Sequence, residues 1–158
     1  MRTELPSVAV VERLKAAGKT VATAESCTGG GIGQSLTSIS GSSSVYLGGV
    51  ISYTNQVKQD LLGVPNQILL DYGAVSAETA AVMASGVRNL IKADFGISVT
   101  GLAGPDGDGS GKPVGLVYIG LASETGVHVE AYHFSGDRQS VRTQAVCAAL
   151  ELLLGELE

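Results

Sequence analysis

The stretch Thr20-Val-Ala-Thr-Ala-Glu-Ser-Cys-Thr-Gly-Gly30 joins a strand to a helix. Residues 20–24 are small or β-branched, which is typical of a short buried strand. Further along, Ile32 and Leu36 are four residues apart, so they share one face of a helix that we expect over residues 27–38. A strand that leads directly into a helix is the repeating unit of an α/β fold.

The turn between these elements carries hydroxyl groups. We expect Ser26 and Thr28 to lie in the first turn of the helix, where unpaired backbone N–H groups and the helix dipole favour an anion or a developing oxyanion. A hydroxyl beside such a site is half of an acyl-transfer centre. The same residues also suit a simple helix cap with closely packed glycines, so the segment alone leaves both interpretations open.

The rest of the chain continues the alternation. Further helices are expected over residues 6–17, 55–62 and 77–91 and after Asp137, with caps at Asn55, Ser76 and Asp137. Further strands are expected over residues 48–54, 95–100, 114–122 and 127–134, the last two as an antiparallel hairpin. This pattern predicts one three-layer α/β/α domain over residues 1–158, with a mixed sheet and strand 95–100 near its centre.

Composition narrows the possible partners and compartment. The net charge of the chain is −5, and its sequence has no stripe of basic residues of the kind that binds nucleic acid. An anionic small molecule can still bind if helix N-termini and a few arginines neutralise its charge locally. No apolar run reaches the ~20 residues of a membrane span, and the first residues do not resemble a secretory signal. Two cysteines are too few for a disulfide framework, so we expect a cytoplasmic protein, and a homodimer is possible on size alone.

Familiar cofactor motifs fail on spacing. Gln34 replaces the third glycine of a dinucleotide fingerprint, Pro113 interrupts a would-be phosphate loop, and Val117 replaces the glutamate of a calcium loop. His128 and His133 are five residues apart in a predicted strand, so they face opposite sides and cannot form a metal pair. We therefore expect neither a metal nor a cofactor.

A serine nucleophile then needs a base other than histidine. Lys58 falls in the first turn of the helix expected over residues 55–62, where the dipole and any burial favour its neutral form. Ser–Lys pairs are an established alternative to Ser–His pairs. A solvated surface lysine is the alternative that the residues leave open, and Cys27 is either a competing nucleophile or a small buried residue.

The motifs, taken in order, resemble a known family. Besides Glu25-Ser-Cys-Thr-Gly-Gly30, the chain contains Gly41-Ser-Ser43, Tyr53-Thr-Asn-Gln-Val-Lys58, Leu62-Gly-Val64, Tyr72-Gly-Ala-Val-Ser76, Val99-Thr-Gly-Leu-Ala-Gly-Pro105, Lys112-Pro-Val-Gly115 and Phe134-Ser-Gly-Asp-Arg138. Together they closely resemble the CinA carboxy-terminal domain family, the nicotinamide-nucleotide amidases. The resemblance covers nearly the whole chain, with Leu102 in place of an expected isoleucine. Since the first expected helix begins at residue 6, we expect a stand-alone form of the domain.

The resemblance implies hydrolysis of nicotinamide mononucleotide to nicotinate mononucleotide and ammonia. It implies that Ser26 attacks the amide carbon and that Lys58 takes its proton, directly or through Ser43. Tyr53 is expected to position the lysine or the substrate.

The same resemblance suggests how the substrate binds. Backbone N–H groups around Thr28, Gly29 and Gly30 are expected to hold the oxyanion, and Thr100 and Gly101 to line the ligand site. Arg138 is expected to hold the phosphate, alone or with Arg142. Two rival functions remain: a pyridine-nucleotide sensor without activity, and a small-amide hydrolase of other specificity.

Overall fold

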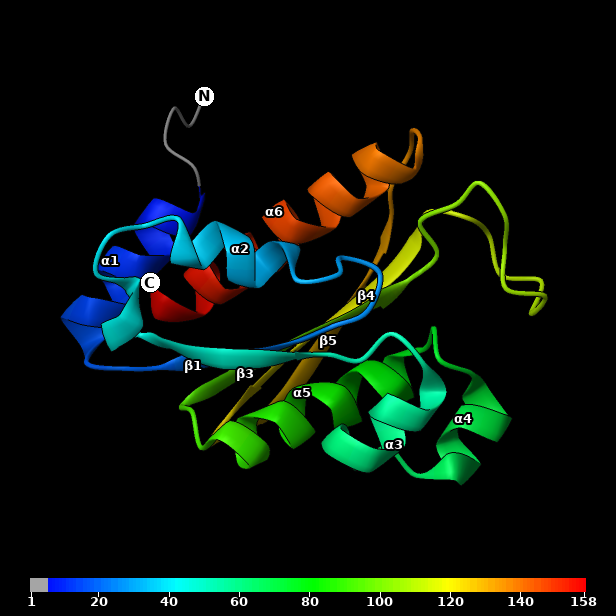
Figure 1. Cartoon of the computed structure of the whole chain (residues 1–158), viewed down its shortest axis with the longest axis horizontal. Helices are drawn as coiled ribbons and strands as arrows, with labels where there is room; N and C mark the ends of the chain where they lie inside the picture. Colours follow the sequence, from blue (N-terminus) through cyan, green and yellow to red (C-terminus); the bar gives the residue numbers. More distant parts are fainter. Residues whose placement is uncertain (1–5) are drawn as a thin grey trace.

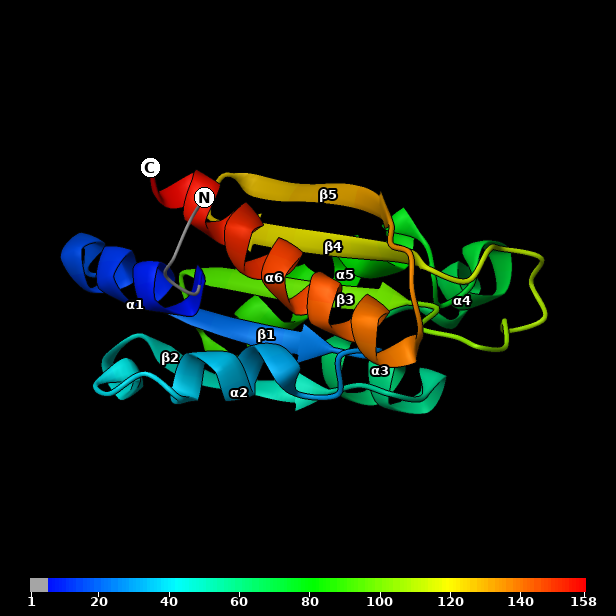
Figure 2. The same ribbon diagram turned by 90° about the horizontal axis from the view of Figure 1, so that it is seen from above.

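A five-stranded mixed sheet lies between two layers of helices in the computed structural model, which describes residues 6–158 (Figures 1 and 2). The strands are β1 (Val21–Glu25), β2 (Tyr46–Ile51), β3 (Phe95–Gly101), β4 (Leu116–Ser123) and β5 (Gly126–His133). Their order is β2-β1-β3-β4-β5, with β2, β1 and β3 parallel and β4 and β5 added antiparallel. The predicted α/β class, mixed sheet and central third strand are confirmed.

Three helices lie on each side of the sheet. One layer contains α1 (Pro6–Ala17), α2 (Gly31–Thr37) and α6 (Arg138–Leu157), and the other contains α3 (Asn55–Leu62), α4 (Asn66–Tyr72) and α5 (Ala77–Ile91) (Figure 1). A short 3-10 helix spans Ser42–Ser44. Within residues 6–158, none of the helices has the length and apolar character needed to cross a membrane. Residues 1–5, the start of the predicted domain, lie outside the described residues.

Local sequence signals set most helix boundaries correctly. The helices predicted over residues 6–17, 55–62 and 77–91 have these limits in the structure. The side chains of Ser76 and Asp137 accept hydrogen bonds from the N–H groups of Thr79 (3.1 Å) and Ser140 (2.8 Å), as the predicted caps require. Each cap satisfies an N–H group that the helix itself leaves unpaired.

Three local predictions were wrong. The helix after β1 begins at Gly31 instead of residue 27, because residues 26–30 form the turn and Gly30 adopts a left-handed conformation. The second strand ends at Ile51 rather than 54, and Thr54, not Asn55, caps α3. Helix α4 was not predicted, since its seven residues give little periodic signal.

Close packing of α5 on the sheet fixes the central strands. A Cβ atom on Gly120 would lie only 2.8 Å from the carbonyl oxygen of Ala80, so only glycine permits this approach. The hydroxyl of Ser98 donates to the same carbonyl over 2.6 Å. The carboxyl ends of β1, β2 and β3 meet at one edge of the sheet, which is where open α/β sheets bind ligands.

Candidate active site

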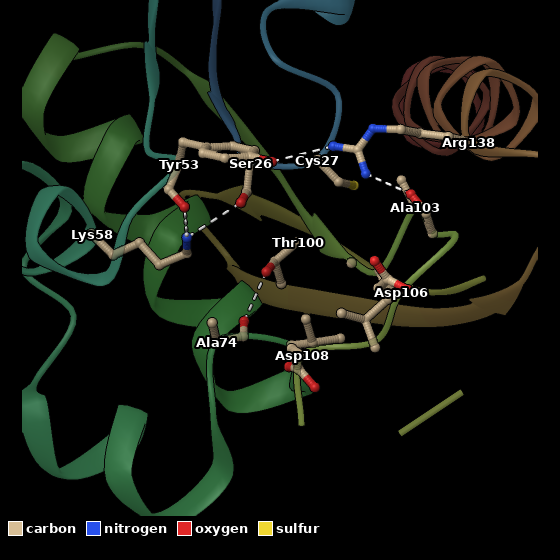
Figure 3. Close-up of a pocket in the computed structure, with 14 residues that line it drawn as sticks. Ser26, Cys27, Tyr53, Lys58, Ala74, Thr100, Ala103, Asp106, Asp108 and Arg138 are labelled. Carbon is tan, nitrogen blue, oxygen red and sulfur yellow. Dashed lines mark hydrogen bonds between the residues drawn. The ribbon is translucent and has the colours of Figure 1, made fainter. Parts of the chain in front are cut away.

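A pocket of about 300 Å³ lies at this edge (Figure 3). Its walls come from five separate segments: Ser26 and Cys27 after β1; Tyr53 and Lys58 around the start of α3; Ala74 and Val75 before α5; residues 100–104 with Asp106 and Asp108 after β3; and Arg138 at the start of α6. Residues distant in sequence therefore meet around one cavity.

Ser26 and Lys58 face each other within this pocket. The Nζ atom of Lys58 lies 3.3 Å from the Oγ atom of Ser26, within hydrogen-bonding distance. It also donates to the carbonyl oxygen of Ser52 over 2.7 Å and lies 3.5 Å from that of Tyr53. Ser26 is 8% exposed and Lys58 only 1%, so the lysine is no surface residue. The alternative of a solvated lysine is thereby eliminated.

Burial changes the acidity of Lys58. Desolvation disfavours the charged ammonium and lowers the pKa of Lys58 from its ordinary 10.5 to about 8. At pH 7 roughly one amine in ten is then neutral, compared with about one in three thousand at the ordinary pKa. No acidic side chain forms an ion pair with Lys58 within 4 Å in residues 6–158. The amine can therefore act as a proton acceptor near neutral pH.

A buried carboxylate shapes the turn that carries Ser26. Glu25, 2% exposed, accepts hydrogen bonds from the Thr28 hydroxyl (2.7 Å) and from the N–H groups of Ile32 (2.8 Å) and Gly33 (3.0 Å). The N–H groups of Ile32 and Gly33 in the first turn of α2 are therefore bonded to Glu25 and are not available to a ligand. Ser26 and Thr28 both precede α2. The prediction that they lie in its first turn, beside an anion site formed by its N–H groups, was therefore wrong.

Arg142 holds the same turn from the other side. Its guanidinium donates to the carbonyl oxygens of Cys27 over 3.0 Å and Thr28 over 3.3 Å. These contacts stabilise the turn that carries Ser26. Arg142 itself does not line the pocket. Thr28, Gly29 and Gly30 also lie outside the pocket lining, and the N–H group of Gly29 donates to the carbonyl oxygen of Ser26.

Arg138, one turn earlier in α6, reaches the pocket. Its Nη1 donates to the carbonyl oxygen of Gly104 over 2.6 Å, and its Nη2 donates to the Tyr53 hydroxyl over 3.2 Å (Figure 3). The Tyr53 side chain is 61% exposed at the pocket, while its carbonyl faces Lys58. Of the two predicted phosphate ligands, the structure brings only Arg138 to the cavity.

Thr100 and Gly101 line the pocket at the end of β3. The Thr100 hydroxyl donates to the carbonyl oxygen of Ala74 over 2.7 Å, which ties β3 to the segment before α5. Lys112 secures the loop after β3, since its Nζ donates to the carbonyl oxygens of Tyr72 (2.6 Å) and Val75. Lys112 therefore stabilises the pocket wall by linking this loop to the segment before α5.

Ser43 lies far from the other predicted catalytic residues. It is exposed in the 3-10 helix that precedes β2. Val45, two residues later, accepts a hydrogen bond from the N–H group of Val21, which places Ser43 near the start of β1. This is the edge of the sheet opposite Ser26, and the length of β1, roughly 13 Å, separates the two edges. Ser43 therefore cannot relay a proton between Ser26 and Lys58 in this chain, which corrects that prediction.

Cys27 is buried beside Ser26, and its burial raises the pKa of the thiol to about 11. A thiol with that pKa stays protonated at neutral pH, so it is a poor nucleophile. This favours the interpretation of Cys27 as a small buried residue.

Three residues of the site could not be assigned a role from the sequence. Glu25 belongs to the motif Glu25–Gly30, but its carboxylate meets its hydrogen-bond donors only in the folded turn. Asp106 and Asp108 belong to a glycine-rich loop whose residue pattern predicts only a flexible turn, whereas both line the pocket. The described residues contain no group of three or more His, Cys, Asp or Glu side chains that could hold a metal ion.

The chain matches known proteins over nearly its full length. The model of the CinA C-terminal domain matches residues 4–157. A CinA-like protein of Synechococcus sp. (strain RCC307) is 50% identical over 148 residues, which cover 91% of this chain and 35% of that protein. The chain thus spans about a third of the length of the curated relatives that it matches.

Solved structures share the fold as well as the sequence. A CinA superfamily protein from Klebsiella pneumoniae superposes with a TM-score of 0.95 at 31% identity, covering 99% of this chain and 98% of that one. The competence/damage inducible protein CihA from Agrobacterium tumefaciens gives a TM-score of 0.93 at 37% identity, covering 100% of this chain and 99% of that one.

Proposed function

The chain belongs to the CinA C-terminal domain family, and we propose that it hydrolyses the carboxamide of nicotinamide mononucleotide, giving nicotinate mononucleotide and ammonia. The observation that carries this proposal is the contact between the buried Lys58 amine and the Ser26 hydroxyl inside a pocket. A hydroxyl beside an amine of lowered pKa is the arrangement that Ser–Lys hydrolases use.

In the first step, the neutral Lys58 amine takes the proton of Ser26 while Oγ attacks the amide carbon. A bond forms between Oγ and carbon, and the carbonyl π electrons move onto oxygen. The pKa of about 8 supports this role, because the amine is neutral often enough to accept a proton and basic enough to keep it.

The tetrahedral oxyanion needs a donor that differs from the one predicted from sequence. The predicted donors Thr28, Gly29 and Gly30 lie outside the pocket lining, and the N–H group of Gly29 is bonded to the Ser26 carbonyl, whereas Cys27 lines the pocket and directly follows the nucleophile. We assign the oxyanion contact to the backbone N–H of Cys27, which Arg142 helps to fix by holding the Cys27 carbonyl.

The protonated Lys58 then returns its proton to the leaving nitrogen. The carbon–nitrogen bond breaks, ammonia departs and an ester on Ser26 remains. A water molecule, deprotonated by Lys58, attacks this ester, so that the product carboxylic acid leaves and Ser26 regains its hydrogen. Lys58 accepts and donates one proton in each half of the cycle, and atoms and charge balance.

Arg138 supports recognition of the nucleotide end. Its guanidinium is the cation on the α6 side of the pocket, and a guanidinium fork suits phosphate oxygens. The exposed Tyr53 side chain lines the pocket with its hydroxyl bonded to Arg138, and its ring can stack on a pyridine ring (Figure 3).

Ammonia release from nicotinamide mononucleotide tests the proposal. Purified protein is incubated with the nucleotide, and ammonia and nicotinate mononucleotide are both quantified, with Lys58→Ala protein as the background control. Equal appearance of the two products supports the amidase. Binding without ammonia release would favour the sensor, and release only from other amides would favour a hydrolase of different specificity.

We propose that the protein acts in the cytoplasm. Both cysteines are free thiols in the structure, which agrees with a reducing compartment such as the cytoplasm. We also propose that the partner is a small-molecule nucleotide, with neither nucleic acid nor membrane, and that the protein is a homodimer.

A further inference from the structure

The pocket carries charges of opposite sign on different walls. Arg138 enters from α6, while Asp106 and Asp108 belong to the loop after β3 (Figure 3). Among residues 6–158 the sole ion pair within 4 Å joins His128 to Glu130, so the guanidinium and the two carboxylates do not neutralise each other by contact. Both kinds of charge therefore remain available to a ligand.

Hydrogen bonds organise the loop that carries Asp108. Asp108 accepts hydrogen bonds from the N–H group (3.0 Å) and the hydroxyl of Ser110, and these bonds lower its pKa and keep it ionised. The Lys112 amine, bound to the carbonyl oxygens of Tyr72 and Val75, ties the same loop to the segment before α5. Asp108 is thus held in a defined turn of this loop, and Asp106 lines the pocket two residues earlier.

A phosphate alone does not explain this wall, because two carboxylates would repel it. The proposed substrate has a second charge, however. The ring nitrogen of nicotinamide mononucleotide is bonded to ribose and is quaternary, so the pyridinium ring is positive while the phosphate is negative. With the carboxamide at Ser26 and the phosphate at Arg138, the ring lies within the pocket that Asp106 and Asp108 line.

We propose that Asp106 and Asp108 are specificity-determining residues that select amides on a positively charged ring, so that the pocket recognises its substrate as a zwitterion. This inference rests on the proposed function and adds the charge state of the substrate class. A neutral ring of the same shape gains no attraction from the carboxylates, so it should bind less tightly.

Binding separates charge recognition from chemistry. In a Ser26→Ala background, calorimetry compares nicotinamide mononucleotide with its reduced dihydropyridine form, which keeps the amide, ribose and phosphate but has a neutral ring. Asp106→Asn and Asp108→Asn are combined, because asparagine keeps an acceptor oxygen for Ser110. Glu124→Gln removes one similar charge at the opposite edge of the sheet and serves as the matched control.

The double variant should raise the Kd of the oxidised nucleotide about tenfold and that of the reduced form less than twofold. The Glu124 variant should change neither. Equal weakening of both ligands, or no weakening of either, would overturn the inference. Failure of the proposed function is a separate result: wild-type protein would release no ammonia from the oxidised nucleotide, whatever the aspartate variants do to binding.

Discussion

The Nζ atom of Lys58 lies 3.3 Å from the Oγ atom of Ser26, although 32 residues separate them in the chain. Two parallel strands create this contact: Ser26 follows β1, and Lys58 lies in the helix after β2. Each residue alone has an ordinary structural interpretation, as a turn serine and as a helix lysine. Their contact inside a pocket is what makes them a candidate nucleophile and base.

Replacement of the nucleophile gives the first prediction. Ser26→Ala should abolish ammonia release while leaving nucleotide binding and folding largely intact, because the loss is confined to the attacking oxygen. Cys27→Ala should be far milder, since its thiol stays protonated. Turnover and calorimetric binding are measured on both variants. A folded Ser26→Ala protein with activity within tenfold of wild type would transfer the nucleophile role to Cys27.

The base gives the second prediction. Lys58→Arg should be nearly as damaging as Lys58→Ala, because a guanidinium cannot lose its proton at working pH. In wild type, kcat/KM should rise with pH up to about 8, the pKa of Lys58, and then level off, since the deprotonated amine is the active form. Substantial activity in Lys58→Arg would reduce the lysine to an electrostatic anchor. A flat profile between pH 6 and 9, with chemistry limiting the rate, would also contradict its role as base.

Burial of an amine should also appear in stability. The pKa of Lys58 is about 8 in the folded protein and about 10.4 when unfolded, so between these values the unfolded chain binds more protons. Unfolding free energy therefore rises with pH through this window, and the burial penalty is full below pH 8. Lys58→Met should stabilise the protein at pH 7 by about 2 kcal/mol, once the lost bond to the Ser52 carbonyl is included.

Denaturant unfolding at two pH values checks this expectation. The stability advantage of Lys58→Met should shrink between pH 7 and pH 10, because the wild-type amine is neutral in the folded protein above pH 8 and the free energy of removing its proton falls as the pH approaches the unfolded pKa. An advantage that is constant over this range would mean that packing of the methionine, rather than charge burial, is responsible.

Recognition of phosphate separates the two arginines. Arg138→Ala should raise the KM for nicotinamide mononucleotide by roughly ten- to hundredfold, about 1.5–3 kcal/mol, and leave hydrolysis of the phosphate-free riboside, which we expect to be slow in wild type, almost unchanged. Arg142→Ala should lower kcat/KM for both substrates alike, because Arg142 holds the Cys27 and Thr28 carbonyls. If Arg138→Ala harms both substrates equally, Arg138 supports the loop at Gly104 instead.

The carboxylate of Glu25 gives the last prediction. Glu25→Gln should destabilise the fold by about 2 kcal/mol and lower kcat, because one end of the amide would direct an N–H group at the N–H of Ile32 or Gly33. Thermal or denaturant unfolding measures the first effect, and turnover of the folded fraction measures the second. Wild-type stability in this variant would show that the turn does not depend on an anionic acceptor.

The sequence by itself determined the features that depend on neighbouring residues. The caps at Ser76 and Asp137 and the limits of α1, α3 and α5 follow from short-range hydrogen bonding and helical periodicity, so they could be predicted. The α/β class followed from the alternation of these elements. The serine, lysine and arginine of the site were recognised through motifs, which indicate residues but not distances.

Tertiary structure alone decided which of these residues meet. The lowered pKa of Lys58 comes from burial by segments distant in sequence. The local residue pattern around Lys58 does not show how far the amine is desolvated. Arg138 reaches the pocket and Arg142 clamps the turn because one helical turn, about 6 Å, separates them along α6. Ser43 is excluded, and Asp106 and Asp108 are included, because strand direction determines which edge of the sheet each loop occupies.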